Sequence, residues 1–151
     1  MSTPAYRVRP ADFADPADAA AAREVRRVVF VIEQGVPESL EIDGRDAGAV
    51  HALAFADDGS AIGTARLLPG GKIGRVAVLA PWRGRGVGAA LMRCLLDAAD
   101  AHGWDEIVLH AQSWTVGFYE KLGFVIEGDE FEEAKIPHRR MVRRRGGICG
   151  S

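Results

Sequence analysis

A glycine-rich hexapeptide is the feature of this sequence that points most directly to chemistry. The run Arg83-Gly84-Arg85-Gly86-Val87-Gly88 follows an extended segment and a Pro81-Trp82 turn, and it stands directly before a long stretch with helical spacing of apolar residues. Glycines let the backbone approach a ligand closely, and the first turn of a helix presents unpaired N–H groups and a favourable dipole to an anion. The two arginines add positive charge suited to phosphate oxygens. The loop therefore predicts a pyrophosphate-binding site.

Other interpretations of this loop stay open at the level of its residues. The glycine spacing is a near miss to a dinucleotide-binding fingerprint, because the third glycine comes too early. A nucleotide-hydrolysing P-loop would need Gly-Lys followed by Ser or Thr, which this run does not have. A purely structural alternative is a glycine-rich turn that packs a helix tightly on a sheet. The flanking Arg83 and Arg85 favour a ligand over that alternative.

The loop has to be held between a strand and a helix, and the surrounding sequence predicts both. Three strand-like runs separated by turn signals indicate an antiparallel meander, and they span His51 to Ala56, Ala61 to Leu68 and Lys72 to Leu79. A helix is expected from Gly86 to His102, with Gly103 as its C-terminal stop. The apolar run from Glu106 to Ala111 then predicts a strand parallel to the one before the helix, since a strand–helix–strand crossover gives a parallel pair.

The remaining segments complete one α/β domain. Asp15 and Pro16 form an N-terminal helix signal, so a helix is expected from Pro16 to about Phe30. The other expected elements are an extended start at Ala5 to Val8, an acidic loop or short irregular helix at Glu38 to Gly48, a helix at Thr115 to Leu122, and strands at Phe124 to Phe131 and His138 to Val142. The fold class predicted is α/β, with a mixed, mostly antiparallel sheet over residues 1–145 and a flexible tail at 146–151.

Bulk properties exclude several classes of protein. A chain of 151 residues with 48% hydrophobic and 26% charged residues is typical of a single globular domain. A net charge of -2 gives no overall attraction to nucleic acid or to an anionic membrane, and the five arginines near the C-terminus lack an accompanying aromatic platform. Cys94 and Cys149 show no metal-binding spacing, so no metal is expected. The sequence shows no secretory leader and no apolar run long enough to span a bilayer, so we expect a cytoplasmic protein.

The loop and two further motifs resemble the GNAT acetyltransferase family. The motifs are the run Arg-x-x-Gly-x-Gly at Arg83 to Gly88, the preceding strand Val76-Ala77-Val78, and the later segment Phe118-Tyr119-Glu120-Lys121-Leu122-Gly123-Phe124. Their order and spacing match the family, and the similarity extends over most of the chain. The segments Val29 to Gly35 and Phe131 to Met141 resemble the ElaA/YjcF-like branch of that family.

This resemblance implies a set of contacts with acetyl-CoA as cosubstrate. The backbone of Arg83, Gly84, Arg85, Gly86, Val87 and Gly88 would hold the pyrophosphate, and Val76, Ala77 and Val78 would pair with the pantetheine arm like an added strand. A bulge in that strand would open it from the next one and admit the thioester. The N–H of Val78 would then face the thioester oxygen, where fixed dipoles stabilise developing charge. Phe118 and Gln112 are also expected at the cosubstrate, although Gln112 stands where the family often has Asn and Thr115 stands where it often has Ala.

The resemblance also implies catalytic roles. Tyr119 matches the family position for the acid that protonates the departing thiolate, and its structural alternative is an aromatic anchor in a local apolar cluster. The amine must be neutral to attack, which requires a base. Glu33 and His110 are the leading candidates, the first at a helix end and the second at a strand end where ligands of α/β proteins gather. An exposed carboxylate and a structural polar residue are the respective alternatives.

The sequence therefore predicts an N-acetyltransferase that transfers the acetyl group of acetyl-CoA to a primary amine by direct attack. The acceptor would be a small molecule or a peptide, and the protein a monomer or a homodimer. A non-catalytic acyl-CoA-binding or regulatory module is the alternative. Carboxylates between Glu33 and Asp46 and between Glu130 and Glu133 lean toward a cationic acceptor, although acidic loops are usually only solvated.

Overall fold

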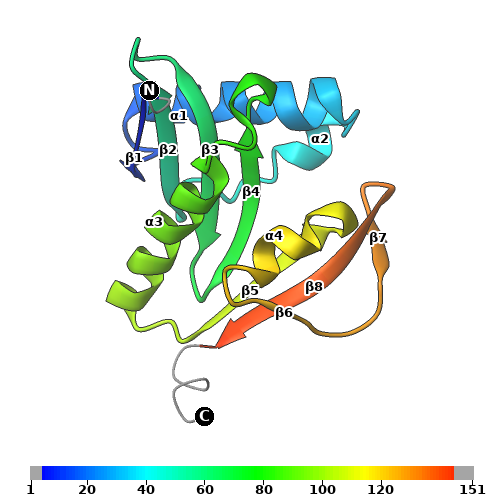
Figure 1. The fold of residues 1–151 in the computed structure, drawn as a ribbon. Coiled ribbons are helices and arrows are strands. Elements are labelled where there is room, and N and C mark those ends of the chain that lie inside the picture. The colour runs from blue at the N-terminus through cyan, green and yellow to red at the C-terminus, as the bar shows by residue number, and fades with distance from the viewer. Residues whose placement is uncertain (1–4, 145–151) are drawn as a thin grey trace.

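One mixed sheet forms the centre of the molecule. The computed structural model describes residues 5–144 of the chain. Within them, strands follow the order β1-β2-β3-β4-β5-β8-β6, and β7 also pairs with β8 (Figure 1). Only β4 and β5 are parallel among the strand pairs of this region. The bounds are β1 Tyr6–Ala11, β2 Val50–Ala56, β3 Ala61–Leu68, β4 Lys72–Val78, β5 Glu106–Gln112, β6 Val125–Ile126, β7 Phe131–Glu133 and β8 Ile136–Arg144. The predicted meander and its parallel partner are confirmed.

Helices cover both faces of this sheet. The long helices are α1 Pro16–Arg26 and α3 Val87–His102, and the short ones are α2 Glu38–Glu41 and α4 Val116–Glu120. Asp15 caps α1 as expected, since its side chain accepts a hydrogen bond from the N–H of Ala17 at 2.9 Å. Gly103 ends α3 in the left-handed conformation that glycine adopts without strain. None of the helices in residues 5–144 is long and apolar enough to cross a membrane.

The core shows that α1 and α3 lie on opposite faces. Leu91 and Leu95 of α3 pack in the main buried cluster with residues of β2, β3 and β5. Val25 of α1 packs instead with Val29 and with Ala77 of β4, in a second buried cluster. Successive side chains of a strand point to opposite faces of the sheet. Ala77 of β4 therefore faces α1, whereas its neighbours Val76 and Val78 pack against the main cluster on the side of α3.

The sheet opens between β4 and β5, and this opening positions the candidate site. The two strands pair only at Lys72 with Val108 and Ile73 with Leu109. Beyond that point the register between β3 and β4 shifts, and Arg75 has a φ of 54°, which is uncommon for a residue with a side chain. Figure 1 shows the two halves of the sheet, β1–β4 and β5–β8, meeting at this pair and diverging from it. The bulge that the family resemblance implies is present.

Two expected elements differ from the structure. The strand expected at Phe124 to Phe131 is wrong as a single element, because β6 and β7 are separate there and Gly128 turns the chain with a φ of 91°. The helix expected from Pro16 to about Phe30 keeps its α-helical form only to Arg26. It then continues as a π-helical stretch, Arg27–Glu33. The expected tail at 146–151 lies outside the described residues.

Candidate active site

The loop at Arg83–Gly88 forms the entry to α3. Gly84 and Gly86 have φ values of 77° and 88°, and Gly86 directly precedes the first helical residue. The N–H of Ala90 donates to the carbonyl of Gly86 at 3.0 Å, which closes the first turn of the helix. The three amides before it, from Val87 to Ala89, have no partner inside a helix and face its N-terminal end. This geometry fits a pyrophosphate, because amides and the helix dipole both favour an anion there.

The two arginines of the loop lie in different environments. The Arg85 guanidinium lies over the ring of Trp82, with 5.2 Å from its central carbon to the ring centroid, and forms no ion pair within the described residues. Arg83 is already engaged. Its Nε donates to the carbonyl of Val78 at 2.8 Å, and its two terminal nitrogens donate to the carboxylate of Glu33 at 2.7 and 3.1 Å. Arg85 is therefore the side chain of the pair that is free to meet a phosphate group.

The edge of β4 that faces the opening carries backbone groups from Val76 and Val78. The N–H of Leu79 donates to the carbonyl of Ile62 in β3 at 2.9 Å. Since backbone groups alternate in direction along a strand, Ala77 also faces β3, whereas Val76 and Val78 face the opposite side. The contact between Arg83 and the Val78 carbonyl lies on that same side. An extended ligand in the opening would meet this edge as an added strand.

A cavity of about 430 Å³ lies next to the opening. Its walls come from β3, β4, β5, the α2 region, α4 and the β7–β8 hairpin. Val76, His110, Gln112 and Tyr119 line it, whereas Glu33 and the Arg83–Gly88 loop are not among its lining residues. The structure thus brings Tyr119 and His110 together around one cavity and leaves Glu33 outside it.

Tyr119 is the most deeply buried of the predicted catalytic side chains, with 7% of its surface exposed. Its ring contacts Phe118 and Phe124 edge to face, with centroid distances of 4.9 and 6.0 Å. Burial raises the pKa of the Tyr119 phenol above its ordinary value, so the hydroxyl keeps its proton at neutral pH. Within residues 5–144 the hydroxyl has no hydrogen-bond partner, so it is available as a donor in the cavity that it lines.

His110 is paired with a carboxylate that also lines the cavity. Its Nδ1 lies 2.8 Å from Oε1 of Glu133, and its ring contacts Phe131 edge to face at a centroid distance of 5.0 Å. A carboxylate on Nδ1 favours the tautomer in which Nδ1 carries the proton, which leaves Nε2 as a proton acceptor. This arrangement has the form of a base oriented by a third group.

Gln112 joins β5 to the end of the π-helical stretch. Its amide nitrogen donates to Oε1 of Gln34 at 2.8 Å, and the amide nitrogen of Gln34 donates back at 3.2 Å. Phe118 of α4 packs against the start of α3, where a Cβ added to Gly88 would lie 3.2 Å from its ring. The glycine therefore allows α3 and α4 to approach closely beneath the loop.

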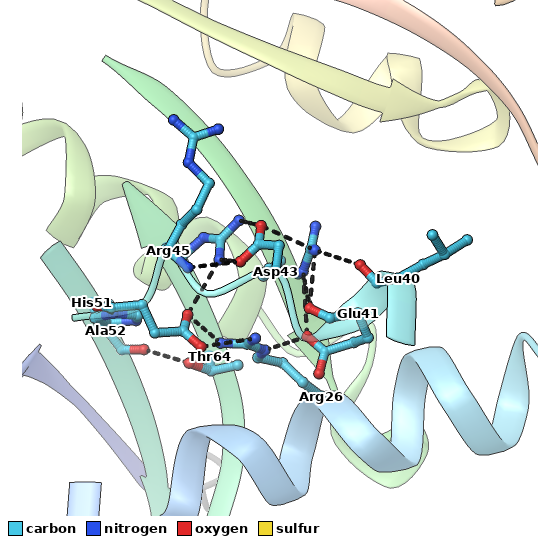
Figure 2. Close-up of polar contacts among 11 residues, drawn as sticks. Arg26, Leu40, Glu41, Asp43, Arg45, His51, Ala52 and Thr64 are labelled. Carbon is cyan, nitrogen blue, oxygen red and sulfur yellow. Dashed lines mark hydrogen bonds and ion pairs between the residues drawn. The ribbon is translucent and has the colours of Figure 1, made fainter. Parts of the chain in front are cut away.

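A buried network of ion pairs forms the wall of the cavity next to α2 (Figure 2). Arg26 is only 1% exposed, and its guanidinium donates to Glu41 at 2.6 Å and to Asp46 at 2.8 and 3.2 Å. Arg66 donates to Asp43 at 2.8 and 2.9 Å and to Asp46 at 3.2 Å. Arginine suits such sites because its planar fork binds carboxylates in a bidentate manner.

Arg75 completes this network from the bulge in β4. It donates to the backbone carbonyls of Leu40 and Glu41 and to the carboxylates of Glu41 and Asp43, at distances between 3.0 and 3.3 Å. The left-handed backbone of Arg75 is thus held by contacts that bind α2 to the sheet. A bulge that re-aims a side chain in this way is a common feature next to active sites.

The arginines keep the acidic groups of this wall ionised. Hydrogen bonds from Arg66 hold the pKa of Asp43 well below its usual range. Burial alone would raise the pKa of Asp46, but the hydrogen bonds and charges of Arg26 and Arg66 outweigh it, and the pKa is lowered. Burial lowers the pKa of His51, whose Nε2 contacts the Asp46 carbonyl at 2.9 Å, so this ring is neutral.

Comparison with known proteins identifies a family over most of the chain. The model of the acetyltransferase (GNAT) domain family matches residues 17–145. The chain belongs to the GNAT acetyltransferase family. It is 38% identical over 123 residues to the uncharacterized N-acetyltransferase YjcF of Bacillus subtilis, which covers 79% of this chain and 87% of YjcF.

Solved structures of GNAT proteins agree with the fold. The crystal structure of Escherichia coli ElaA superposes with a TM-score of 0.82 at 30% identity, covering 92% of this chain and 99% of ElaA. An acyl-CoA N-acyltransferase from Pseudomonas aeruginosa superposes with the same TM-score at 33% identity and the same coverage. Family and neighbours together identify this GNAT protein as an acyl-CoA-dependent N-acyltransferase.

Several residues of this GNAT site have no local signal in the sequence. Glu133 lies in an acidic run, and only the β7–β8 hairpin brings it to His110. The network of Arg26, Arg66 and Arg75 joins segments far apart in the chain, so no motif identifies it. Gln34 follows the residues that suggest the ElaA/YjcF-like branch, but its partner Gln112 is 78 positions away.

Proposed function

We propose that this protein transfers an acetyl group from acetyl-CoA to a primary amine, and that His110 is the base. Membership of the GNAT family supports acyl transfer to an amine in general. The observation that carries the finer proposal is the cavity at the β4–β5 opening, which brings the His110–Glu133 pair and the buried Tyr119 hydroxyl to the same space.

The base acts on the incoming amine. An ammonium group cannot attack a thioester, so the amine must lose a proton before or during attack. Nε2 of His110 accepts that proton, directly or through a water molecule, while Glu133 holds the ring by its Nδ1 and stabilises the imidazolium that results. Glu33 is less suited to this role, because its carboxylate is held by Arg83 and does not line the cavity.

The edge of β4 and the Tyr119 hydroxyl would stabilise the negative charge that develops on the thioester oxygen and on the departing thiolate. The N–H of Val78 faces the opening and would donate to the carbonyl oxygen of the thioester as negative charge develops on it. That charge develops because the amine nitrogen bonds to the acetyl carbon and gives a tetrahedral intermediate, and the carbon–sulfur bond breaks when this intermediate collapses. The Tyr119 hydroxyl, which retains its proton, donates to the departing thiolate of coenzyme A.

Most of the remaining predicted residues would bind the pyrophosphate and the pantetheine arm of coenzyme A. The backbone from Arg83 to Gly88 and the Arg85 side chain would hold the pyrophosphate, since the amides of the first turn of α3 point to one place. Val76 would keep the pantetheine arm extended along β4, with Phe118 and Gln112 beside the opening. The contact expected of Ala77 is not supported, because Ala77 pairs with Thr64 of β3 and its side chain packs with Val25 and Val29.

Turnover with a broad panel of amines tests this proposal. Release of coenzyme A is followed with a thiol reagent, and the acetylated product is identified by mass spectrometry. His110→Gln should lower kcat by roughly 10²-fold or more, because a positioned base is worth about that much. Retention of full turnover by His110→Gln would exclude this histidine as the base. Binding of acetyl-CoA without turnover on any amine would favour a non-catalytic acyl-CoA-binding module instead.

A further inference from the structure

We infer that the acceptor of this enzyme is an amine that carries a carboxylate at its far end. This inference rests on the proposed function, since it names the substrate class of the same cavity. Many of the side chains that line the cavity are of charged types. Seven of the lining residues are Asp, Glu, Arg or Lys: Glu41, Asp43, Arg45, Arg66, Lys72, Arg75 and Glu133.

The acidic groups of the α2 wall are not available to a cationic ligand. Glu41 is bound by Arg26 and Arg75, and Asp43 is bound by Arg66 and Arg75. Each carboxylate thus already has two guanidinium partners. The preference for a cationic acceptor that the acidic sequence suggests therefore has no support on this side of the cavity. An ammonium group there would have to compete with arginines that are held in place by several hydrogen bonds.

The wall of the cavity next to α2 carries positive charge that is not paired with a carboxylate. Arg45, which follows α2, is exposed and forms no ion pair with another described residue. Lys72 also lines the cavity exposed and without an ion pair to a described residue, but it lies at the start of β4, where that strand pairs with Val108 of β5. Figure 2 shows the Arg45 side chain extending away from the network, while its backbone N–H donates to Asp43 at 3.1 Å. Arg75 adds a further donor, because its contacts within the described residues use Nε and one terminal nitrogen and leave Nη1 free.

The wall of the cavity formed by β5 and the β7–β8 hairpin carries a carboxylate in place of unpaired positive charge. There, among the described residues, the carboxylate of Glu133 is paired with His110 and with no arginine or lysine. An amine is attracted to this side, next to the proposed base. A ligand with an amine at one end and a carboxylate at the other thus matches both walls of the same cavity. Arginine binds carboxylates well in such a position, because its fork can donate two parallel hydrogen bonds.

Matched series of amines test this inference. The probes are ω-amino acids of increasing length, the alkylamines of equal length, and the corresponding diamines, each with saturating acetyl-CoA. Wild-type protein is compared with Arg45→Ala, with Arg45→Glu, and with Arg7→Ala, which removes an exposed arginine of β1 that lies outside the cavity. Binding of the same probes to the protein–coenzyme A complex is measured in parallel by calorimetry.

We expect wild-type protein to favour an ω-amino acid over the alkylamine of equal length. Arg45→Ala should lower the ratio of their kcat/KM values about tenfold, since one hydrogen bond to a charged group is worth about that factor. Arg45→Glu should shift the preference to the diamine, and Arg7→Ala should behave as wild type.

The outcomes separate this inference from the proposed function. Equal use of all three series, with no change in Arg45→Ala, overturns the inference while acetyl transfer stands. Binding of ω-amino acids that depends on Arg45, without acetylation of any amine, upholds the ligand class and overturns the transfer. The absence of both binding and turnover overturns the two together.

Discussion

Removal of the Arg26 guanidinium should destabilise the protein more than most single substitutions. In Arg26→Met the side chain keeps much of its apolar length, but Glu41 and Asp46 lose three hydrogen bonds of 2.6 to 3.2 Å in a region where Arg26 is 1% exposed. Each carboxylate keeps one weaker arginine contact, at 3.2 Å. Loss of one partner from a buried ion pair costs about 3–5 kcal/mol, because it leaves a buried charge uncompensated.

Thermal and urea unfolding measure this loss. A domain of this size changes its melting temperature by about 2–4 °C per kcal/mol, so the expected drop is roughly 6–20 °C. Arg27→Met is the matched control, because Arg27 is the next residue and its ion pair with Glu24 is exposed. That variant should unfold close to wild type. The reasoning fails if the two variants unfold at the same temperature, since burial would then contribute nothing.

Three further predictions concern the ligand, the chemistry and the pH. Acetyl-CoA at about 100 times its Kd should stabilise the protein by about 2.7 kcal/mol. Gly86→Val should abolish this shift, because its φ is 88° and a Cβ there lies 3.3 Å from the Tyr6 hydroxyl; a normal shift in that variant would refute the loop assignment. Tyr119→Phe keeps the ring, so kcat should fall by up to about 10²-fold with little change in the KM of acetyl-CoA; an unchanged kcat when chemistry limits the rate would make Tyr119 structural. The pKa values of Asp43 and Asp46 are lowered in the folded state, so the stability that they contribute is complete above about pH 3.9 and is lost as the pH falls through their folded-state values. Asp43→Asn should flatten this acid limb in urea titrations, and an unaltered limb would contradict the pairing with Arg66.

Local signals in the sequence were enough to predict the central elements. Glycine and proline turns bound the strands of the meander, and α3 starts and stops at glycines in the left-handed conformation. The element bounds from Val50 to Gln112 accordingly agree with expectation within two residues. The segment after Phe124 also contains a glycine signal, Gly128, which the expectation of a single strand passed over. In the structure β6 and β7 pair with β8 separately, before and after that turn.

The candidate site was predictable on the cosubstrate side and much less so on the acceptor side. The proposed pyrophosphate site consists of backbone amides of one loop and one helix end, so a contiguous motif contains the information. The cavity proposed for the acceptor is built from segments between Phe30 and His138 that meet only in the fold. Glu33, which was expected as a candidate base, shows why contacts between distant segments are hard to predict from the sequence. Its position near a helix end was apparent, but its ion pair with Arg83, 50 residues away, follows from tertiary structure alone.

This ion pair and the residue after it connect the π-helical stretch to both sides of the opening. Its last residue, Glu33, binds Arg83, which in turn donates to the Val78 carbonyl on the β4 side of the opening. The next residue, Gln34, forms reciprocal hydrogen bonds with Gln112 on the β5 side. Two consecutive residues of one segment therefore bridge the two halves of the diverging sheet, at the place where few strand-to-strand hydrogen bonds connect them. The extra residue that a π-helical turn accommodates shifts the direction of the side chains that follow it. The segment that contacts both sides of the opening therefore also lines the cavity, at Phe30 and Gln34.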